Sequence, residues 1–334
     1  MIPVVFGLAG AALSARERDF FREADPAGYI LFGRNVVDRA QLRALTDDLR
    51  TLHGRTDLPI LIDQEGGRVQ RMKPPEWPVF PPGAVFDRLW EVAPMSAMEA
   101  ARAHAEALAL TLSEVGISVD CLPLLDVRQP GASDVIGDRA LGAEPVRVAS
   151  IGRAILDGLA AGGVVGVMKH MPGHGRAGVD SHLSLPVVEA DAAALASDIT
   201  PFQRLADAPM GMTAHVVYTA WDPERPATLS PTVIDGVIRK QIGFDGFLFT
   251  DDIDMKALSG TPAEKAVAAI AAGCDAVLDC WARMDEMEAV AAVLPTMAAA
   301  SVDRLDRAMA MRSAPDAARL DDLVAKRDAL LALA

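Results

Sequence analysis

Eight short apolar runs, separated by segments of helical length, constrain the fold of this chain more than any other feature of its sequence. The runs are continuous rather than alternating in polarity, which is typical of parallel strands covered on both faces. Strand followed by helix, repeated eight times, predicts an α/β fold, a single (β/α)8 TIM barrel, whose usual size is about 250 residues before insertions. The runs are Val4–Leu8, Gly28–Phe32, Leu58–Asp63, Val119–Leu125, Val164–His170, Met210–His215, Gly246–Asp251 and Cys274–Asp279.

The main alternative to a closed barrel is a doubly wound open sheet, since periodicity alone does not show closure. No G-x-G-x-x-G sequence follows the first run, which weakens the dinucleotide-binding version of that alternative. No linker divides the chain, so we expect residues 1–334 to form one catalytic domain. The Pro-rich segment 73–82 is expected to form a rigid loop over the barrel mouth. The helices from about residue 296 are expected to pack on the barrel exterior.

The apolar stretch Ile2–Ala15 resembles the core of a signal peptide, but its first basic residue, Arg16, comes after the run instead of before it. We therefore expect a buried strand and a turn, followed by a helix with a capping box formed by Ser14 and Glu17. No later uncharged run approaches the roughly 18 residues that a membrane-spanning helix needs. These features predict a cytoplasmic protein without membrane association.

The charge balance excludes two classes of partner. Asp and Glu number 46 against 32 Lys and Arg, a formal net charge of -14. Binding to nucleic acid or to anionic membranes needs clustered basic residues, so neither is expected. The three cysteines, Cys121, Cys274 and Cys280, are an odd number without metal-type spacing, which fits a reducing compartment and no disulfide framework.

Polar side chains end four of the predicted strands. Asp63 ends the third, Lys169 and His170 end the fifth, His215 ends the sixth, and Asp251 ends the seventh. A single polar ending could mark a return to solvent, but four favour a site. In barrel enzymes the carboxyl ends of the strands carry the chemistry. The sequence therefore predicts an active site at this face.

The segment after the fifth strand is the richest in candidate chemistry. It reads Lys169-His170-Met171-Pro172-Gly173-His174-Gly175, then Val179-Asp180-Ser181-His182, and holds three of the six histidines. Imidazole binds zinc and iron well, so a metal site built from these histidines with His215 or Asp251 is one hypothesis. Pro172 and Gly173 prevent the helical spacing that would align His170 with His174, and we expect no metal.

Acid–base chemistry is the second hypothesis for the same segment. If the backbone is extended, Asp180 and His182 project to the same side. A carboxylate bonded to one imidazole nitrogen favours the cation and leaves the other nitrogen to transfer protons. An incidental surface pair is the alternative, but the Gly-rich loop after a polar strand end favours the catalytic interpretation.

Two further groups of residues suit a site that binds a polar ligand. Asp251 arrives at the end of an apolar strand and could be a nucleophile, a base or a metal ligand, whereas Asp252 should face away and make a structural hydrogen bond. Asp63 lies near Arg71, and Arg139 follows the fourth strand. Asp and Arg suit bidentate bonding to vicinal hydroxyls, and an internal ion pair is the alternative in both cases.

Taken together, these motifs resemble those of the family-3 glycoside hydrolases, and more narrowly the single-domain bacterial β-N-acetylglucosaminidases. The resemblance spans most of the chain, and the Lys-His-x-Pro-Gly-His-Gly…Asp-Ser-His motif is highly specific. The matching segments are Leu31–Asn35, Asp63–Arg71, Gly137–Arg139, Lys169–His182, Met212–His215, Leu229–Pro231 and Thr250–Asp252.

The resemblance implies a retaining glycosidase. Asp251 would be the nucleophile that forms a covalent glycosyl-enzyme, and His182, paired with Asp180, would be the general acid/base. This differs from the usual pair of carboxylates about 5–5.5 Å apart. The resemblance also implies which residues bind the sugar hydroxyls: Asp63, Arg71, Arg139, Lys169 and His170.

For substrate, the resemblance implies terminal non-reducing β-1,4-linked N-acetylglucosamine of (1,6-anhydro)muropeptides, removed during cell-wall recycling by a monomer that needs no cofactor. Because muropeptides carry carboxylates, Arg71, Arg139 and Lys169 would have to make the mouth locally positive against the net charge. Open alternatives are a β-glucosidase or β-xylosidase, transfer of the glycosyl group to phosphate instead of water, a metallohydrolase, and a catalytically inactive sugar sensor.

Overall fold

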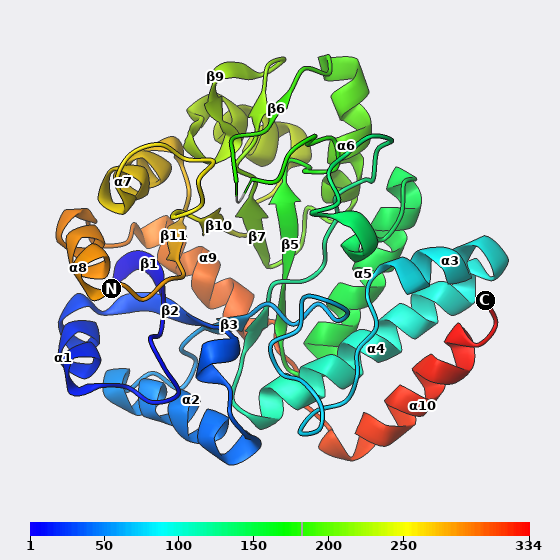
Figure 1. Cartoon of the computed structure of the whole chain (residues 1–334), viewed down its shortest axis with the longest axis horizontal. Coiled ribbons are helices and arrows are strands. Elements are labelled where there is room, and N and C mark those ends of the chain that lie inside the picture. The colour runs from blue at the N-terminus through cyan, green and yellow to red at the C-terminus, as the bar shows by residue number, and fades with distance from the viewer. Residues whose placement is uncertain (182) are drawn as a thin grey trace.

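A closed barrel of eight parallel strands forms the centre of the protein, in a computed structural model that describes residues 1–181 and 183–334 (Figure 1). The strands follow one another around the barrel in the order β1-β11-β10-β7-β5-β4-β3-β2. Each coincides with one of the eight predicted runs, so the prediction of a (β/α)8 barrel is confirmed. The bounds are β1 Ile2–Gly7, β2 Pro26–Leu31, β3 Ile60–Ile62, β4 Val119–Asp120, β5 Val165–Met171, β7 Met210–Thr213, β10 Phe247–Asp252 and β11 Ala276–Asp279.

Helices surround the strands on all sides (Figure 1). The capping box expected at the start of α1 is present, formed by Ser14 and Glu17, and at the start of α2 the Asp38 carboxylate accepts the backbone N–H of Gln41. The helices of the barrel are α1 Ala15–Ala24, α2 Arg39–His53, α3 Ala84–Val92, α4 Pro94–Glu114, α5 Pro145–Ala161, α6 Ala192–Arg204, η4 Thr232–Ile242, α7 Pro262–Ala272 and α8 Met284–Val293.

The core has two layers. One lies between strands and helices, and the other fills the barrel interior with side chains such as Val167, Met212 and Phe249. Helix α9 (Ala299–Ala310) contributes Leu305 and Met309 to the interior layer, near the start of β1, so it covers the amino end of the barrel. Helix α10 (Leu320–Leu331) packs along α4 on the outside (Figure 1). The carboxyl end is therefore the open one.

Loops and short elements build that carboxyl end. A small sheet of β6 (Val187–Val188), β8 (Val217–Tyr218) and β9 (Asp222–Pro226) lies beyond β5 and β7. The Pro-rich segment 73–82 packs against the loop after β3, where the carbonyl of Phe80 accepts the N–H of Gly67 at 2.8 Å. Gly66 has a φ of +90, and a Cβ there would lie 2.3 Å from the carbonyl oxygen of Pro81, so only glycine fits.

A helix that spans a membrane must be both long and apolar. Within residues 1–181 and 183–334, none is both long enough and apolar enough to cross a bilayer.

Candidate active site

A cavity of about 360 Å³ opens at the carboxyl ends of the strands. This is near the lower end of the range for small-molecule sites. Ser181 also lines it, directly after Asp180, whereas His182 lies outside the described residues. The cavity is lined by the six described residues that were predicted to bind the sugar or to act as the nucleophile: Asp63, Arg71, Arg139, Lys169, His170 and Asp251.

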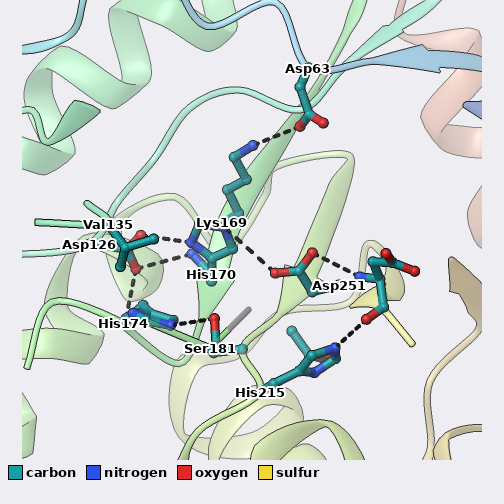
Figure 2. Close-up of polar contacts among 12 residues, drawn as sticks. Asp63, Asp126, Val135, Lys169, His170, His174, Ser181, His215 and Asp251 are labelled. Carbon is teal, nitrogen blue, oxygen red and sulfur yellow. Dashed lines mark hydrogen bonds and ion pairs between the residues drawn. The ribbon is translucent and has the colours of Figure 1, made fainter. Parts of the chain in front are cut away.

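A buried network of cations and carboxylates forms one wall of the cavity. The ammonium of Lys169 lies 3.1 Å from Asp63 Oδ1 and 2.6 Å from Glu65 Oε1 (Figure 2 shows the first of these contacts). The guanidinium of Arg139 donates hydrogen bonds of 2.8 Å to both carboxylate oxygens of Glu65. Arg71 Nη2 lies 3.3 Å from Asp63 Oδ2. The internal ion pairs considered for Asp63 and Arg139 are therefore present, within a wall that also faces the cavity.

The network fixes the charges of its members. Burial alone would raise the pKa of Glu65, but the charges of Arg139 and Lys169 outweigh it and lower the pKa to about 2. Burial likewise opposes ionisation of Asp63, and Lys169 and Arg71 lower its pKa. Burial would lower the pKa of Lys169, yet the two carboxylates raise it. These groups stay ionised near neutral pH, so they suit hydrogen bonding to a ligand better than proton transfer.

His170 is held between two carboxylates. Its Nδ1 lies 2.8 Å from Asp126 Oδ2, and its Nε2 lies 4.0 Å from Asp251 Oδ2 (Figure 2). Asp126 also accepts the backbone N–H groups of His170 and His174 at 3.1 and 2.7 Å. Burial would raise the pKa of Asp126, but the charge and hydrogen bonds of His170 lower it to about 2. Asp126 thus fixes the orientation of the His170 ring.

Asp126 and Glu65 were missed by the sequence reasoning. Each had a signal: Asp126 directly follows the apolar run of the fourth strand, and Glu65 lies within the motif that begins at Asp63. Their importance depends on partners far along the chain, since Glu65 pairs with Arg139 and Asp126 with His170.

His174 links this wall to the loop that carries Asp180. Its Nε2 lies 3.2 Å from Ser181 Oγ (Figure 2), and the carbonyl of Ser181 accepts the N–H of Ala257 from the loop after β10. Burial, together with the nearby His170, lowers the pKa of His174 to about 4. The imidazole is therefore neutral at physiological pH and serves to hold the loop.

The interpretation of Asp180 and His182 as a pair on extended backbone includes His182, which lies outside the described residues. The N–H groups of Leu183 and Ser184 both donate to the carbonyl of Asp180, at 2.9 and 3.1 Å, so the chain turns there. These hydrogen bonds satisfy backbone groups that have no strand partner in a loop. Any pairing of Asp180 with His182 thus cannot be argued from strand alternation.

The predicted division between Asp251 and Asp252 at the end of β10 is confirmed for the structural hydrogen bonds of Asp252 but wrong for its direction, because both residues line the cavity. Asp251 lines the cavity, and its Oδ1 accepts the backbone N–H of Asp252 at 2.8 Å. Asp252 accepts the N–H groups of Asp254 and Cys280, which is the structural bonding expected of it, although it also reaches the cavity. Burial and the adjacent Asp251 raise the pKa of Asp252 to about 6.

His215, one of the histidines in the metal-site hypothesis, forms two hydrogen bonds with other described residues. Its Nδ1 lies 2.7 Å from Thr228 Oγ1 and its Nε2 lies 2.9 Å from the carbonyl oxygen of Asp252, so both ring nitrogens are engaged (Figure 2 shows the second contact). Among residues 1–181 and 183–334, no three or more His, Cys, Asp or Glu side chains form a group that could hold a metal ion.

Comparisons with known proteins agree with this geometry. The family model described as "Glycosyl hydrolase family 3 N terminal domain" matches residues 6–310. A β-hexosaminidase of Bordetella avium is 38% identical over 322 residues, covering 94% of this chain and 90% of that protein. One from Alkalilimnicola ehrlichii is 41% identical over 300 residues, covering 87% and 83%. The crystal structure of NagZ from Neisseria gonorrhoeae in complex with N-trifluoroacetyl-D-glucosamine superposes with a TM-score of 0.88 at 31% identity, covering 99% of this chain and 97% of that one.

The chain forms a barrel with charged residues at its carboxyl end, and this family model matches the chain over nearly its whole length. Together these findings define a saccharide-cleaving enzyme. The chain belongs to glycosyl hydrolase family 3. Within the family it is a glycoside hydrolase of the β-hexosaminidase type, and the resemblance found in the sequence is confirmed.

Proposed function

We propose that the chain is a retaining exo-β-N-acetylglucosaminidase that removes terminal non-reducing β-1,4-linked N-acetylglucosamine from (1,6-anhydro)muropeptides in peptidoglycan recycling. The observation that carries the proposal is a single cavity in which Asp251 faces a wall of fixed donors and acceptors. The N-acylated glucosamine bound by the gonococcal NagZ favours an amino sugar as the group that this cavity holds.

The wall is the proposed binding site for the sugar hydroxyls. Hydroxyls both donate and accept hydrogen bonds, and the wall offers both functions. Because each charged group is already held by an opposite charge, little reorganisation accompanies binding, which favours catalysis. In this proposal the hydroxyl-binding residues are Asp63, Arg71, Arg139, Lys169 and His170.

Asp251 is the proposed nucleophile. One of its oxygens is oriented by the backbone N–H of Asp252, and the other lies 4.0 Å from His170 Nε2. In the first step its carboxylate bonds to the anomeric carbon while the glycosidic C–O bond breaks and the departing oxygen receives a proton. In the second step water gives a proton to the base and displaces the carboxylate, so the configuration is retained.

His182, paired with Asp180, is the proposed general acid/base. The carboxylates of the wall suit this role poorly, because Glu65 has a pKa of about 2 and the pKa of Asp63 is lowered. An imidazole with an ordinary pKa near 6.5 can give a proton and take one back near neutral pH. Ser181, the residue between them in the sequence, is held by His174.

The physiological setting completes the proposal. Recycling of muropeptides places the enzyme in the cytoplasm, where we propose that it acts as a monomer without a cofactor.

A direct test offers the purified enzyme N-acetylglucosaminyl-β-1,4-anhydro-N-acetylmuramic acid, in buffer with and without phosphate. We expect release of free N-acetylglucosamine, first as the β anomer by NMR. Faster cleavage of a matched β-glucoside or β-xyloside would contradict the amino-sugar assignment. Glycosyl phosphate as the main product would contradict hydrolysis. Alanine at Asp251 or His182 should nearly abolish turnover of the disaccharide.

A further inference from the structure

An exposed aromatic ring and a cation adjoin each other on the cavity rim, outside the wall described above. Trp281 follows β11 and is 57% exposed, although it lines the same cavity as Asp251. Arg34 follows β2, and its Nη2 donates to the carbonyl of Cys280, the residue before Trp281. An exposed tryptophan at the mouth of a binding cavity is a common sign of a ligand surface.

The order of strands places Trp281 beside the strand that carries Asp251. β3 and β10 are four positions apart among the eight, so Asp63 and Asp251 approach the cavity from opposite sides of the barrel. A sugar held by the hydroxyl-binding wall, with its anomeric carbon at Asp251, has its aglycone at the end that is away from the wall. β11 and β7 are the two neighbours of β10 in the closed barrel, and Trp281 extends the chain from β11 into the lining of the same cavity.

Arg34 differs from the other cations of the cavity in its electrostatic partners. The three cations of the wall, Arg71, Arg139 and Lys169, face Asp63 and Glu65. These carboxylates therefore largely neutralise the three cations. The positive charge at the cavity mouth is much smaller than the three cations alone would give.

The guanidinium of Arg34, unlike those of the wall, binds backbone carbonyls instead of carboxylates. It donates to the carbonyls of Leu8 and Cys280, and lies 4.7 Å from the ring centroid of Phe32. Within the described part of the chain it forms no ion pair with a carboxylate. Asp252 is near enough to act on it through space, but Asp252 Oδ1 accepts backbone N–H groups instead.

We propose that Trp281 and Arg34 form the subsite for the aglycone, with the indole stacking on the face of the aglycone sugar and Arg34 binding a carboxylate that the aglycone carries. The inference rests on the proposed function, since it assumes that the terminal sugar occupies the wall. It assigns the recognition of an acidic aglycone to a cation that the motifs did not single out for substrate binding.

The test compares kcat/KM for three substrates with the same terminal sugar. Methyl β-N-acetylglucosaminide has no aglycone ring, N,N′-diacetylchitobiose has a neutral one, and N-acetylglucosaminyl-β-1,4-anhydro-N-acetylmuramic acid has an acidic one. Loss of about 60 Å² of ring contact in Trp281→Ala predicts a decrease of about tenfold for both disaccharides, mainly in KM. The decrease for the methyl glycoside should be less than twofold. Trp281→Phe should keep most of the wild-type value.

The charge of Arg34 is tested by a ratio, because both replacements disturb its hydrogen bonds. Arg34→Lys keeps the charge and should preserve the preference for the acidic over the neutral disaccharide, whereas Arg34→Gln should lose it. A disaccharide that carries a tripeptide shows whether the carboxylate belongs to the peptide or to the sugar. Arg34→Gln should lower kcat/KM for the acidic substrate whose carboxylate binds Arg34. Met95→Ala, at an exposed apolar residue of α4 that does not line the cavity, is the control.

Equal losses on all three substrates in Trp281→Ala, or no loss on any, would overturn the stacking role. Identical preferences in the two Arg34 variants would overturn the charge role. The proposed function fails separately, if the wild-type enzyme does not cleave the acidic disaccharide. The comparison of chitobiose with the methyl glycoside still tests Trp281 in that case.

Discussion

Asp126→Asn removes one buried charge at nearly constant side-chain size. The resulting loss in the free energy of unfolding can be worked out from the structure. Asp126 is fully buried and accepts hydrogen bonds from the backbone of His170, the ring of His170 and the backbone of His174. In the folded protein its pKa is about 2, against 3.8 as the ordinary value. That difference corresponds to about 2 kcal/mol of stability at neutral pH.

The sign of the pH dependence follows from the lowered pKa. A carboxylate whose folded pKa lies below its unfolded value stabilises the protein fully above the unfolded value, and this stabilisation disappears as the pH falls through the folded value. The contribution of Asp126 should thus be complete at pH 7, about half lost at pH 3, and absent below about pH 1.

Equilibrium urea unfolding of wild type and Asp126→Asn, followed by tryptophan fluorescence, measures this contribution. We expect a loss of about 2 kcal/mol in the free energy of unfolding at pH 7, shrinking to about half at pH 3. Asp138→Asn is the control, because Asp138 forms an exposed ion pair with Arg68 that should contribute less than about 1 kcal/mol. An unchanged free energy at pH 7, or a loss that stays constant down to pH 3, would refute the reasoning.

Further predictions concern the chemistry and the buried wall. Asp251→Asn should lower kcat by about 10⁴-fold, whereas Asp252→Asn, on the same strand, should stay within about tenfold of wild type; equal losses would contradict the assignment of the nucleophile. In His182→Ala, kcat should fall by about 10²-fold or more for the methyl glycoside and much less for 4-nitrophenyl N-acetylglucosaminide, whose leaving group needs no proton; equal falls would argue against a general acid. Lys169→Met leaves two buried carboxylates short of one partner and should destabilise the fold by about 3–5 kcal/mol in urea unfolding, so a neutral result would contradict the network. Activity should be unchanged after prolonged dialysis against EDTA, and a loss restored by zinc would favour the metallohydrolase alternative.

The strands were predictable because parallel strands buried on both faces need unbroken apolar runs, and that need is local in the sequence. The same applies to the start of α1, since the capping box of Ser14 and Glu17 involves residues three apart. Residues at strand ends could likewise be placed at one face, because every parallel strand of a barrel points the same way. Asp63, Lys169 and Asp251 meet in the cavity for that reason.

What sequence reasoning missed depends on contacts between distant residues. Arg139 was expected near the site, but its bidentate partner Glu65 lies 74 positions earlier, and no local pattern connects the two. Asp126 and His170 are separated by 44 positions. The alternation rule applied to Asp180 assumed an extended backbone, whereas the carbonyl of Asp180 accepts the N–H groups of Leu183 and Ser184.

The central claim is that Asp251 forms a covalent bond to the sugar. The most direct measurement is mass spectrometry of the enzyme after incubation with a slow substrate, 2-acetamido-2-deoxy-5-fluoro-β-glucosyl fluoride, followed by peptide mapping. The account predicts one added glycosyl group per chain, located on the peptide that contains Asp251 and absent in Asp251→Asn. A label on any other residue, or turnover of this substrate with inversion and no label, would contradict it.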